Sequence, residues 1–302
     1  MQNSSSTIDA SDRTVDARDV EPSVESVIRD LIRRPRRPSV RHCFLALAAG
    51  LVDPFNGVFS TLLGIFRRST LPADADTPQR RRHGLVIVLG GIEGPSRYNR
   101  TMARSILDAG FRGAVIRCDW NKGVPIVRSF VNLMHRGHQE RQSNGVVAIV
   151  EDHASAHPGS PVFILAQSGG CWIAVRTLEK LHSPGIVDAC VFLAPSISPG
   201  SDLRAALANC RHGIVAVGGA GDMIFLGLGT LVFGTSDRVH APAAGWVGWR
   251  RPPPPLFEVR WRPEWIRLGY WGNHTTTSAP DFLREKIAPV FIRAAEQRRK
   301  SP

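Results

Sequence analysis

The sequence has few cysteines and no pattern that would organise them. The five cysteines are odd in number and irregularly spaced, and no Cys-x-x-Cys pair occurs. Disulfide scaffolds and structural zinc sites need paired or regularly spaced thiols, so both classes are disfavoured. We therefore expect reduced thiols and no metal site.

The sequence also lacks an unbroken apolar run of transmembrane length. Residues 43–66 are strongly apolar, but Asp53, Pro54 and Asn56 interrupt them, whereas a spanning helix needs about 20 consecutive apolar residues. Three interpretations remain for this segment: a membrane-associated hairpin or anchor, a displaced signal segment, or a helix packed on the domain. Its distance from the N-terminus disfavours an ordinary signal peptide and favours a packed or peripheral helix.

Acidic residues are scarce relative to basic ones. There are 26 Asp and Glu against 38 Lys and Arg, which gives a formal net charge of +12. Arginines cluster within 29–41 and 80–82, and residues 298–300 are all basic. Such clusters either attract anionic lipid or nucleic acid or form solvated arms. No nucleic-acid-binding signature accompanies them, so nucleic acid is disfavoured. Peripheral membrane contact through residues 29–70 remains an expectation.

Composition divides the chain into three parts. Residues 1–40 are polar without apolar periodicity, and we expect a mostly disordered basic arm with a short helix near 26–34. Residues 41–80 hold the apolar segment and a linker. In 81–302, short apolar runs alternate with helical stretches, as in proteins with a parallel sheet. The prediction is an α/β domain with a mostly parallel central sheet and helices on both faces.

Two features of the predicted domain concern its insertions. Only one short helix fits between the apolar runs at 187–195 and 212–222, so no large cap domain is expected there. The segment 223–265 is rich in Gly, Trp, Arg and Pro and is interpreted as a cover over the site or as a surface excursion. A further strand is expected at 266–271.

The most informative motif is a serine between an apolar run and a helical one. In the stretch ILAQSGGCW, Ser168 is flanked at two residues' distance by Ala166 and Gly170, which is the G-x-S-x-G pattern with its first glycine replaced. Ser168 would then project from the carboxyl end of a strand. The amide of Gly169 and the start of the next helix would face a developing oxyanion. The alternative is a turn that only ends the strand.

A nucleophilic serine needs a base and an orienting acid, which follow it in the order acid, histidine in this kind of site. Asp222 follows the apolar run IVAVGGAG, whereas the alternative acid, Asp237, follows no clear strand. His274 lies in the loop WGNHTTTS before the last helix. A second oxyanion donor, Gly91 or Ile92, is expected in the loop LGGIEGPS, which lacks the G-x-G-x-x-G spacing of a nucleotide site.

Over residues 83–297 these motifs resemble the α/β-hydrolase superfamily, in particular its esterase- and lipase-like serine hydrolases. The resemblance implies hydrolysis of a small-molecule or lipid ester through an acyl-enzyme, without metal or organic cofactor. It makes Ser168 the nucleophile, His274 the proton carrier and Asp222 its partner. Gly169 and Ile92, with Gly91 as the alternative, would bind the oxyanion. The chain departs from the pattern at Ala166 and in the first loop, which lacks a His-Gly pair.

Two other functions fit the same scaffold. One is a non-catalytic interaction protein that kept the fold, and the other is an acyltransferase that uses the same three residues. The expected location is cytoplasmic or membrane-associated.

Overall fold

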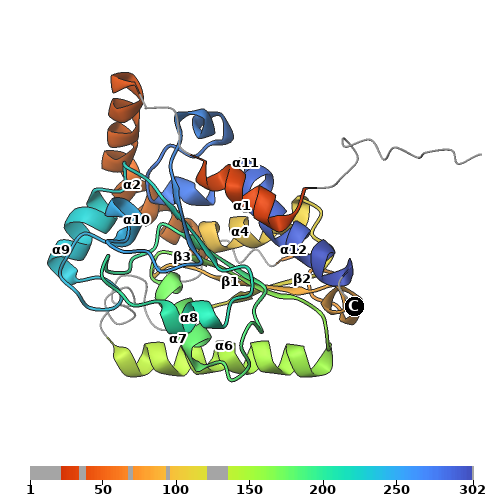
Figure 1. Ribbon diagram of the computed structural model, residues 1–302. Coiled ribbons are helices and arrows are strands. Elements are labelled where there is room, and N and C mark those ends of the chain that lie inside the picture. Colours follow the sequence, from red (N-terminus) through yellow and green to blue (C-terminus); the bar gives the residue numbers. More distant parts are fainter. Residues whose placement is uncertain (1–21, 34–38, 67–70, 93–95, 121–134, 301–302) are drawn as a thin grey trace, which may run out of the picture.

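The computed structural model describes residues 22–33, 39–66, 71–92, 96–120 and 135–300, and of residues 58–66 only the backbone (Figure 1). Most of the expected disordered arm, residues 1–21 and 34–38, lies outside this part of the chain. All five cysteines are described and free, and burial raises the pKa of the Cys118 thiol to about 11.

A six-stranded, all-parallel sheet in the order β2-β1-β3-β4-β5-β6 forms the centre of the molecule. Its strands are β1 (Leu85–Leu89), β2 (Ala114–Cys118), β3 (Val162–Gln167), β4 (Ala189–Leu193), β5 (Ile214–Gly218) and β6 (Leu256–Arg260). The strands β1, β3, β4 and β5 are buried along their whole length, because helices cover both faces. Burial on both faces explains why these strands are continuous apolar runs in the sequence.

Successive side chains along each strand point to opposite faces of the sheet and belong to two separate hydrophobic cores. Val86 and Val88 of β1 pack with α1 (Val24–Ile32), α4 (Arg97–Asp108) and α12 (Ala288–Lys300). Leu85 and Ile87 pack on the opposite face with α6 (Arg136–Ala156), α7 (Gly170–Lys180) and α8 (Arg204–Ala208). Figure 1 shows the two helical layers above and below the sheet. The predicted fold class, a parallel sheet with helices on both faces, is confirmed.

The short helix expected near residues 26–34 of the N-terminal arm is present, but it is packed into the core, which was not expected. Residues 24–32 form α1, whose apolar side chains Val24, Ile28 and Leu31 are buried in the core. Their spacing of four and three residues puts them on one face of the helix. The Arg262 guanidinium donates to backbone carbonyls at the end of α1, including that of Leu31 at 2.7 Å. Thus α1 is part of the folded domain.

The apolar segment forms one long helix, α2 (Val40–Phe66), although a break at Asp53 and Pro54 was expected from the sequence. The helix continues past Pro54 because neighbouring groups hold its inner face, where Ala46, Gly50 and Asp53 are buried. Among the described residues, no helix combines the length and apolar character needed to cross a membrane.

The connections follow the predicted outline with two exceptions. Between β4 and β5, which are described without gaps, the only helix is α8, so that connection holds no large cap. The expected strand at 266–271 is instead mostly a 3-10 helix, η2 (Pro263–Leu268), which ends at Gly269 with φ of +79°. The edge strand β6 was not predicted. The remaining elements are α3 (Pro78–Arg81), η1 (Ile224–Gly229), α9 (Thr230–Phe233), α10 (Ala244–Val247), η3 (Thr275–Ser278), α11 (Pro280–Phe282) and η4 (Leu283–Ile287).

Candidate active site

Ser168 occupies the junction between β3 and α7 in a strained backbone conformation. Its φ is +52°, a value that residues with a β-carbon rarely adopt. Three backbone hydrogen bonds hold it there: its N–H donates to Leu193 at 2.9 Å, and its carbonyl accepts from Cys171 at 3.1 Å and Ser196 at 3.3 Å. Such over-determined strain is found at functional sites, and here it turns the side chain out of the strand at the carboxyl edge of the sheet.

The turn after Ser168 requires glycine because backbone passes close to it. A β-carbon on Gly170 would lie 2.3 Å from the carbonyl oxygen of Gly90, at the end of β1. A β-carbon on Gly169 would lie 2.6 Å from Cγ2 of Ile92 and 3.5 Å from Oγ of Ser236. The first helical turn of α7 therefore lies against the loop after β1. The structure brings Ile92 beside Gly169, as an oxyanion site built from both would need.

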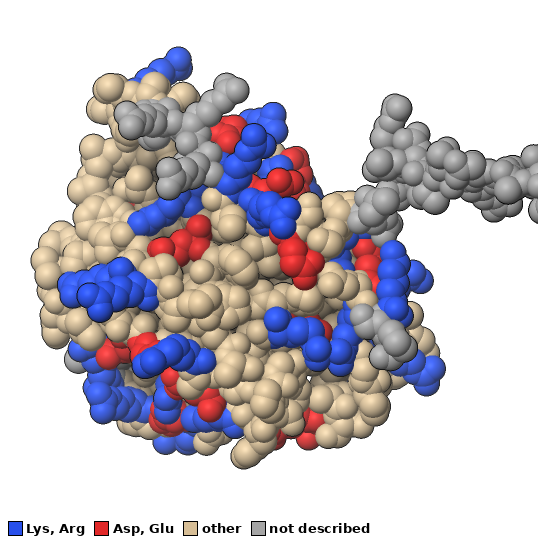
Figure 2. Space-filling model, in the orientation of Figure 1, with Lys and Arg blue, Asp and Glu red and all other residues tan. Residues whose placement is uncertain are grey.

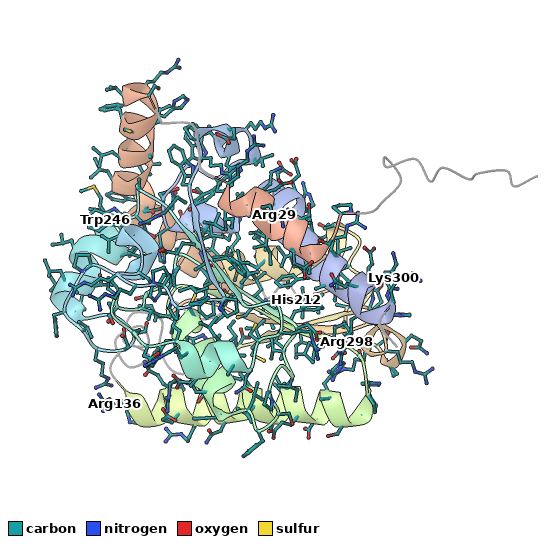
Figure 3. The ribbon with its side chains drawn as sticks, in the orientation of Figure 1. Arg29, Arg136, His212, Trp246, Arg298 and Lys300 are labelled. Atoms are coloured by element: carbon teal, nitrogen blue, oxygen red, sulfur yellow. The ribbon has the colours of Figure 1, made fainter. Side chains whose placement is uncertain are left out.

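The carboxylate of Asp222 contacts the imidazole of His274. Oδ2 of Asp222 is 2.7 Å from Nδ1 of His274. Asp222 is 1% exposed, so water hardly weakens this contact. Asp222 follows β5 after the turn Gly219–Gly221. Hydrogen bonds hold this turn in place: Trp246 (labelled in Figure 3) donates to the carbonyl of Ala220 at 3.0 Å, and the N–H of Gly221 donates to the carbonyl of Gly272 at 2.9 Å.

Further contacts tie the His274 loop to the serine junction. Gln167, which directly precedes Ser168, donates from Nε2 to the carbonyl of His274 at 3.4 Å and to Oγ1 of Thr277 at 3.2 Å. The His274 ring also packs on Phe225, with ring centroids 5.0 Å apart. The histidine therefore lies in the same region as Ser168, between the ends of β3 and β5.

The alternative acid, Asp237, is engaged elsewhere. Its carboxylate accepts from the backbone N–H of Ser198 at 2.8 Å and from the hydroxyls of Ser198 and Ser201 at 2.5 and 2.7 Å. These hydrogen bonds attach the connection after β5 to the loop after β4. Ser236 next to it lies against the turn that follows Ser168, so this part of segment 223–265 packs beside the serine junction.

One buried acid near His274 was missed in the sequence. Asp53 of α2 is 1% exposed and accepts hydrogen bonds from the loop residues Asn273, His274 and Thr275. Burial and the nearby Asp222 raise the pKa of Asp53, while hydrogen bonds from Thr275 and His274 oppose the shift. Its signal in the sequence is an acid within an apolar segment, a pattern that by itself indicates only an interruption of that segment.

No metal site accompanies these residues in the described part of the chain, where no cluster of three or more His, Cys, Asp or Glu side chains has an arrangement suited to holding an ion.

A parallel sheet with a positive-φ serine between strand and helix, followed in the chain by an acid and a histidine in contact, is the arrangement of α/β hydrolases. The chain has the α/β-hydrolase fold.

No protein-family model matches the chain, and no curated protein matches it. Similar solved structures include lipase B of Aspergillus fumigatus, with 12% identity and a TM-score of 0.40 over 77% of this chain and 66% of the lipase. MenH from S. aureus is similar at 9% identity and a TM-score of 0.39, over 76% and 98% of the two chains. A cutinase-like protein from Cryptococcus sp. has 15% identity and a TM-score of 0.35, over 71% and 93%. The chain spans just under two thirds of the lipase. These likenesses concern the fold alone.

Proposed function

We propose that this protein is a serine hydrolase that cleaves carboxylic esters through an acyl-enzyme. Its main support is the 2.7 Å contact between Asp222 and His274 in a site whose serine has a φ of +52°. A turn that only ended β3 would need neither the Asp222–His274 contact nor a serine with positive φ. Burial of the acid and strain at the serine both cost stability, and such costs are typical of catalytic sites.

In the proposed mechanism, Nδ1–H of His274 donates to Asp222, which leaves Nε2 to take the proton of the Ser168 hydroxyl. The serine oxygen attacks the ester carbon, and the amides of Gly169 and of Ile92 or Gly91 receive the negative charge. His274 then returns the proton to the leaving alcohol. Water repeats the sequence on the acyl-enzyme, which releases the acid and restores Ser168.

A fluorophosphonate probe tests the nucleophile, since it reacts with activated serines. We expect labelling of the folded protein that disappears in Ser168→Ala and persists in Ser183→Ala, a change at an exposed serine. Hydrolysis of short p-nitrophenyl esters should follow the same pattern. Absence of labelling in the folded wild type would reject the hydrolase and favour an interaction protein. Product formed mainly on an added alcohol, rather than with water, would favour an acyltransferase.

We further propose that the protein binds an anionic lipid surface and finds its ester substrate there. The outer face of α2 carries large apolar side chains that are exposed, namely Val40, Phe44, Leu47, Leu51 and Phe55. Their spacing of three or four residues forms one stripe along the helix. In Figure 2 the surface over α2, at upper left, carries hardly any charge apart from a basic side chain at its outer end. An apolar stripe next to arginines suits a helix that lies in a lipid interface.

Cosedimentation with vesicles tests this contact. Binding is expected to vesicles of phosphatidylcholine with phosphatidylglycerol, to be weaker without the anionic lipid, and to be lost in Phe44→Ser/Leu51→Ser/Phe55→Ser. Val239→Ser is the control, because Val239 is exposed but lies away from α2 in the chain. Failure of the wild type to bind, or its dimerisation through the stripe in light scattering, would reject the lipid surface.

A further inference from the structure

The buried carboxylate of Asp53 is surrounded by donors from three consecutive loop residues. Nδ2 of Asn273 and the backbone N–H of His274 each lie 2.6 Å from it. The backbone N–H of Thr275 lies at 3.3 Å, and the Thr275 hydroxyl also donates to it. All these hydrogen bonds converge on the segment centred on His274. A charged acceptor makes them stronger than neutral hydrogen bonds.

The helix that carries Asp53 can approach this loop because its inner face has small residues. A β-carbon on Gly50 would lie 2.0 Å from the carbonyl oxygen of Gly221, and one on Gly221 would lie 2.3 Å from that of Ala46. Gly221 immediately precedes Asp222. One face of α2 therefore contacts both the loop of the proposed acid and the loop of the proposed base.

The backbone of His274 is fixed on both sides. Its N–H donates to Asp53 at 2.6 Å, and its carbonyl accepts from Gln167, the neighbour of Ser168. Its ring is held separately by Asp222 at 2.7 Å. Asp53 thus binds the backbone N–H of His274, whereas Asp222 contacts its ring.

We infer that Asp53 is a positioning residue for catalysis. It holds the backbone of His274 in the position from which the ring can reach both Asp222 and Ser168. The inference rests on the proposed function, since it assigns a role within that same site. It makes α2 part of the catalytic unit, although the helix precedes the first strand of the sheet. The opposing view is that Asp53 only anchors α2, in which case its loss would lower stability and leave turnover intact.

Asp53→Asn tests the inference because it keeps the size of the side chain and removes its charge. One carboxylate oxygen becomes an NH₂ group that cannot accept from the loop donors. We expect kcat for a p-nitrophenyl ester to fall about 10- to 100-fold, as for a histidine displaced by about 1 Å, with KM within about twofold. Thr275→Val removes a single donor and should lower kcat less, which covers the case that Asp53→Asn fails to fold.

Asp188→Asn is the matched control. Asp188 is a buried carboxylate that binds the backbone N–H of Val162 at 3.1 Å and the side chain of Arg211 at 3.3 Å, at the amino end of β3. A second arginine near Asp188, Arg298, lies on the opposite side of the molecule from Trp246 (Figure 3). This variant should lower the melting temperature and leave kcat unchanged. Equal kcat in the wild type and folded Asp53→Asn would overturn the inference.

A second measurement separates this inference from the proposed function. The proton shared by Nδ1 of His274 and Asp222 should give a downfield proton NMR resonance in the wild type. We expect the resonance to shift or broaden in Asp53→Asn and Thr275→Val and to persist in Asp188→Asn. An unchanged resonance in Asp53→Asn would overturn the positioning role. If Ser168 proves inert to the probe, the proposed function fails, while this measurement still decides whether Asp53 positions His274.

Discussion

Ile92 and Gly169 lie so close that a β-carbon on Gly169 would sit 2.6 Å from Cγ2 of Ile92. We therefore expect Gly169→Ala to push the loop after β1 away from the serine and to lower kcat/KM by about 10²-fold, the effect of losing one oxyanion donor. The double variant Gly169→Ala/Ile92→Ala removes the obstructing side chain and keeps both backbone amides. Ester hydrolysis should recover in the double variant, and no recovery would argue against an oxyanion site here.

The strain at Ser168 should be measurable as lost stability. Ser168→Gly relieves the cost of a φ of +52°, which should raise the free energy of unfolding by about 1 kcal/mol while abolishing activity. Ser168→Ala is the matched control, because it removes the hydroxyl and keeps the β-carbon. Urea unfolding of the three proteins compares them. If the glycine variant is no more stable than the alanine variant, the junction is not strained.

The two candidate acids should differ sharply in their effect on turnover. Asp222→Asn removes the charge that orients His274 and should lower kcat by roughly 10²- to 10⁴-fold. Asp237→Asn changes a carboxylate that three serine donors bind and should lower mainly stability. Steady-state kinetics and thermal melts on both variants make the comparison. A larger kcat loss in Asp237→Asn would reject the proposed triad.

Acid should destabilise the fold through His153. Burial lowers the pKa of His153 to about 4, and the nearby His157 and Arg81 contribute to the shift. The unfolded chain, with a histidine pKa of about 6.5, binds this proton more readily. Stability is therefore expected to fall as the pH drops from about 6.5 to 4, with no contribution from His153 above that window.

Urea unfolding across this pH range, with the wild type beside His153→Gln, measures the effect. The difference in free energy of unfolding between the two proteins should shift in favour of the variant as the pH falls. A difference that stays constant from pH 7 to pH 4 would contradict the assignment to His153.

Local patterns sufficed for those parts of the fold and site that depend on short stretches of chain. The buried strands are continuous apolar runs, and Ser168 stands out because a strand, a turn and a helix meet within a few residues. Asp222 and His274 were selected by chain order, and the structure places them in contact. Their catalytic roles stay predictions.

The parts that were missed depend on partners far away in the chain. The partners of Asp53 lie 220 to 222 positions later in the chain, so the residues around Asp53 in the sequence do not reveal its role. The edge strand β6 follows a segment rich in proline, and only Leu256 and Val259 of its five residues are buried, so it lacks the apolar run of the central strands. For α1 the short helix was expected, but its burial was not, because its apolar residues are few and stand among arginines.

Because α2 contacts both loops of the proposed site, the smallest fragment that we expect to behave like the whole chain must include α2. A fragment that begins at residue 81 would keep all six strands and both loops of the proposed oxyanion site, yet it would lack Asp53 and the buried face of α1. Anyone who shortens, fuses or grafts this protein should place the first residue before Val24. In this chain the boundary of the folded domain is set by α1 and α2, two helices that precede the sheet, rather than by the first strand.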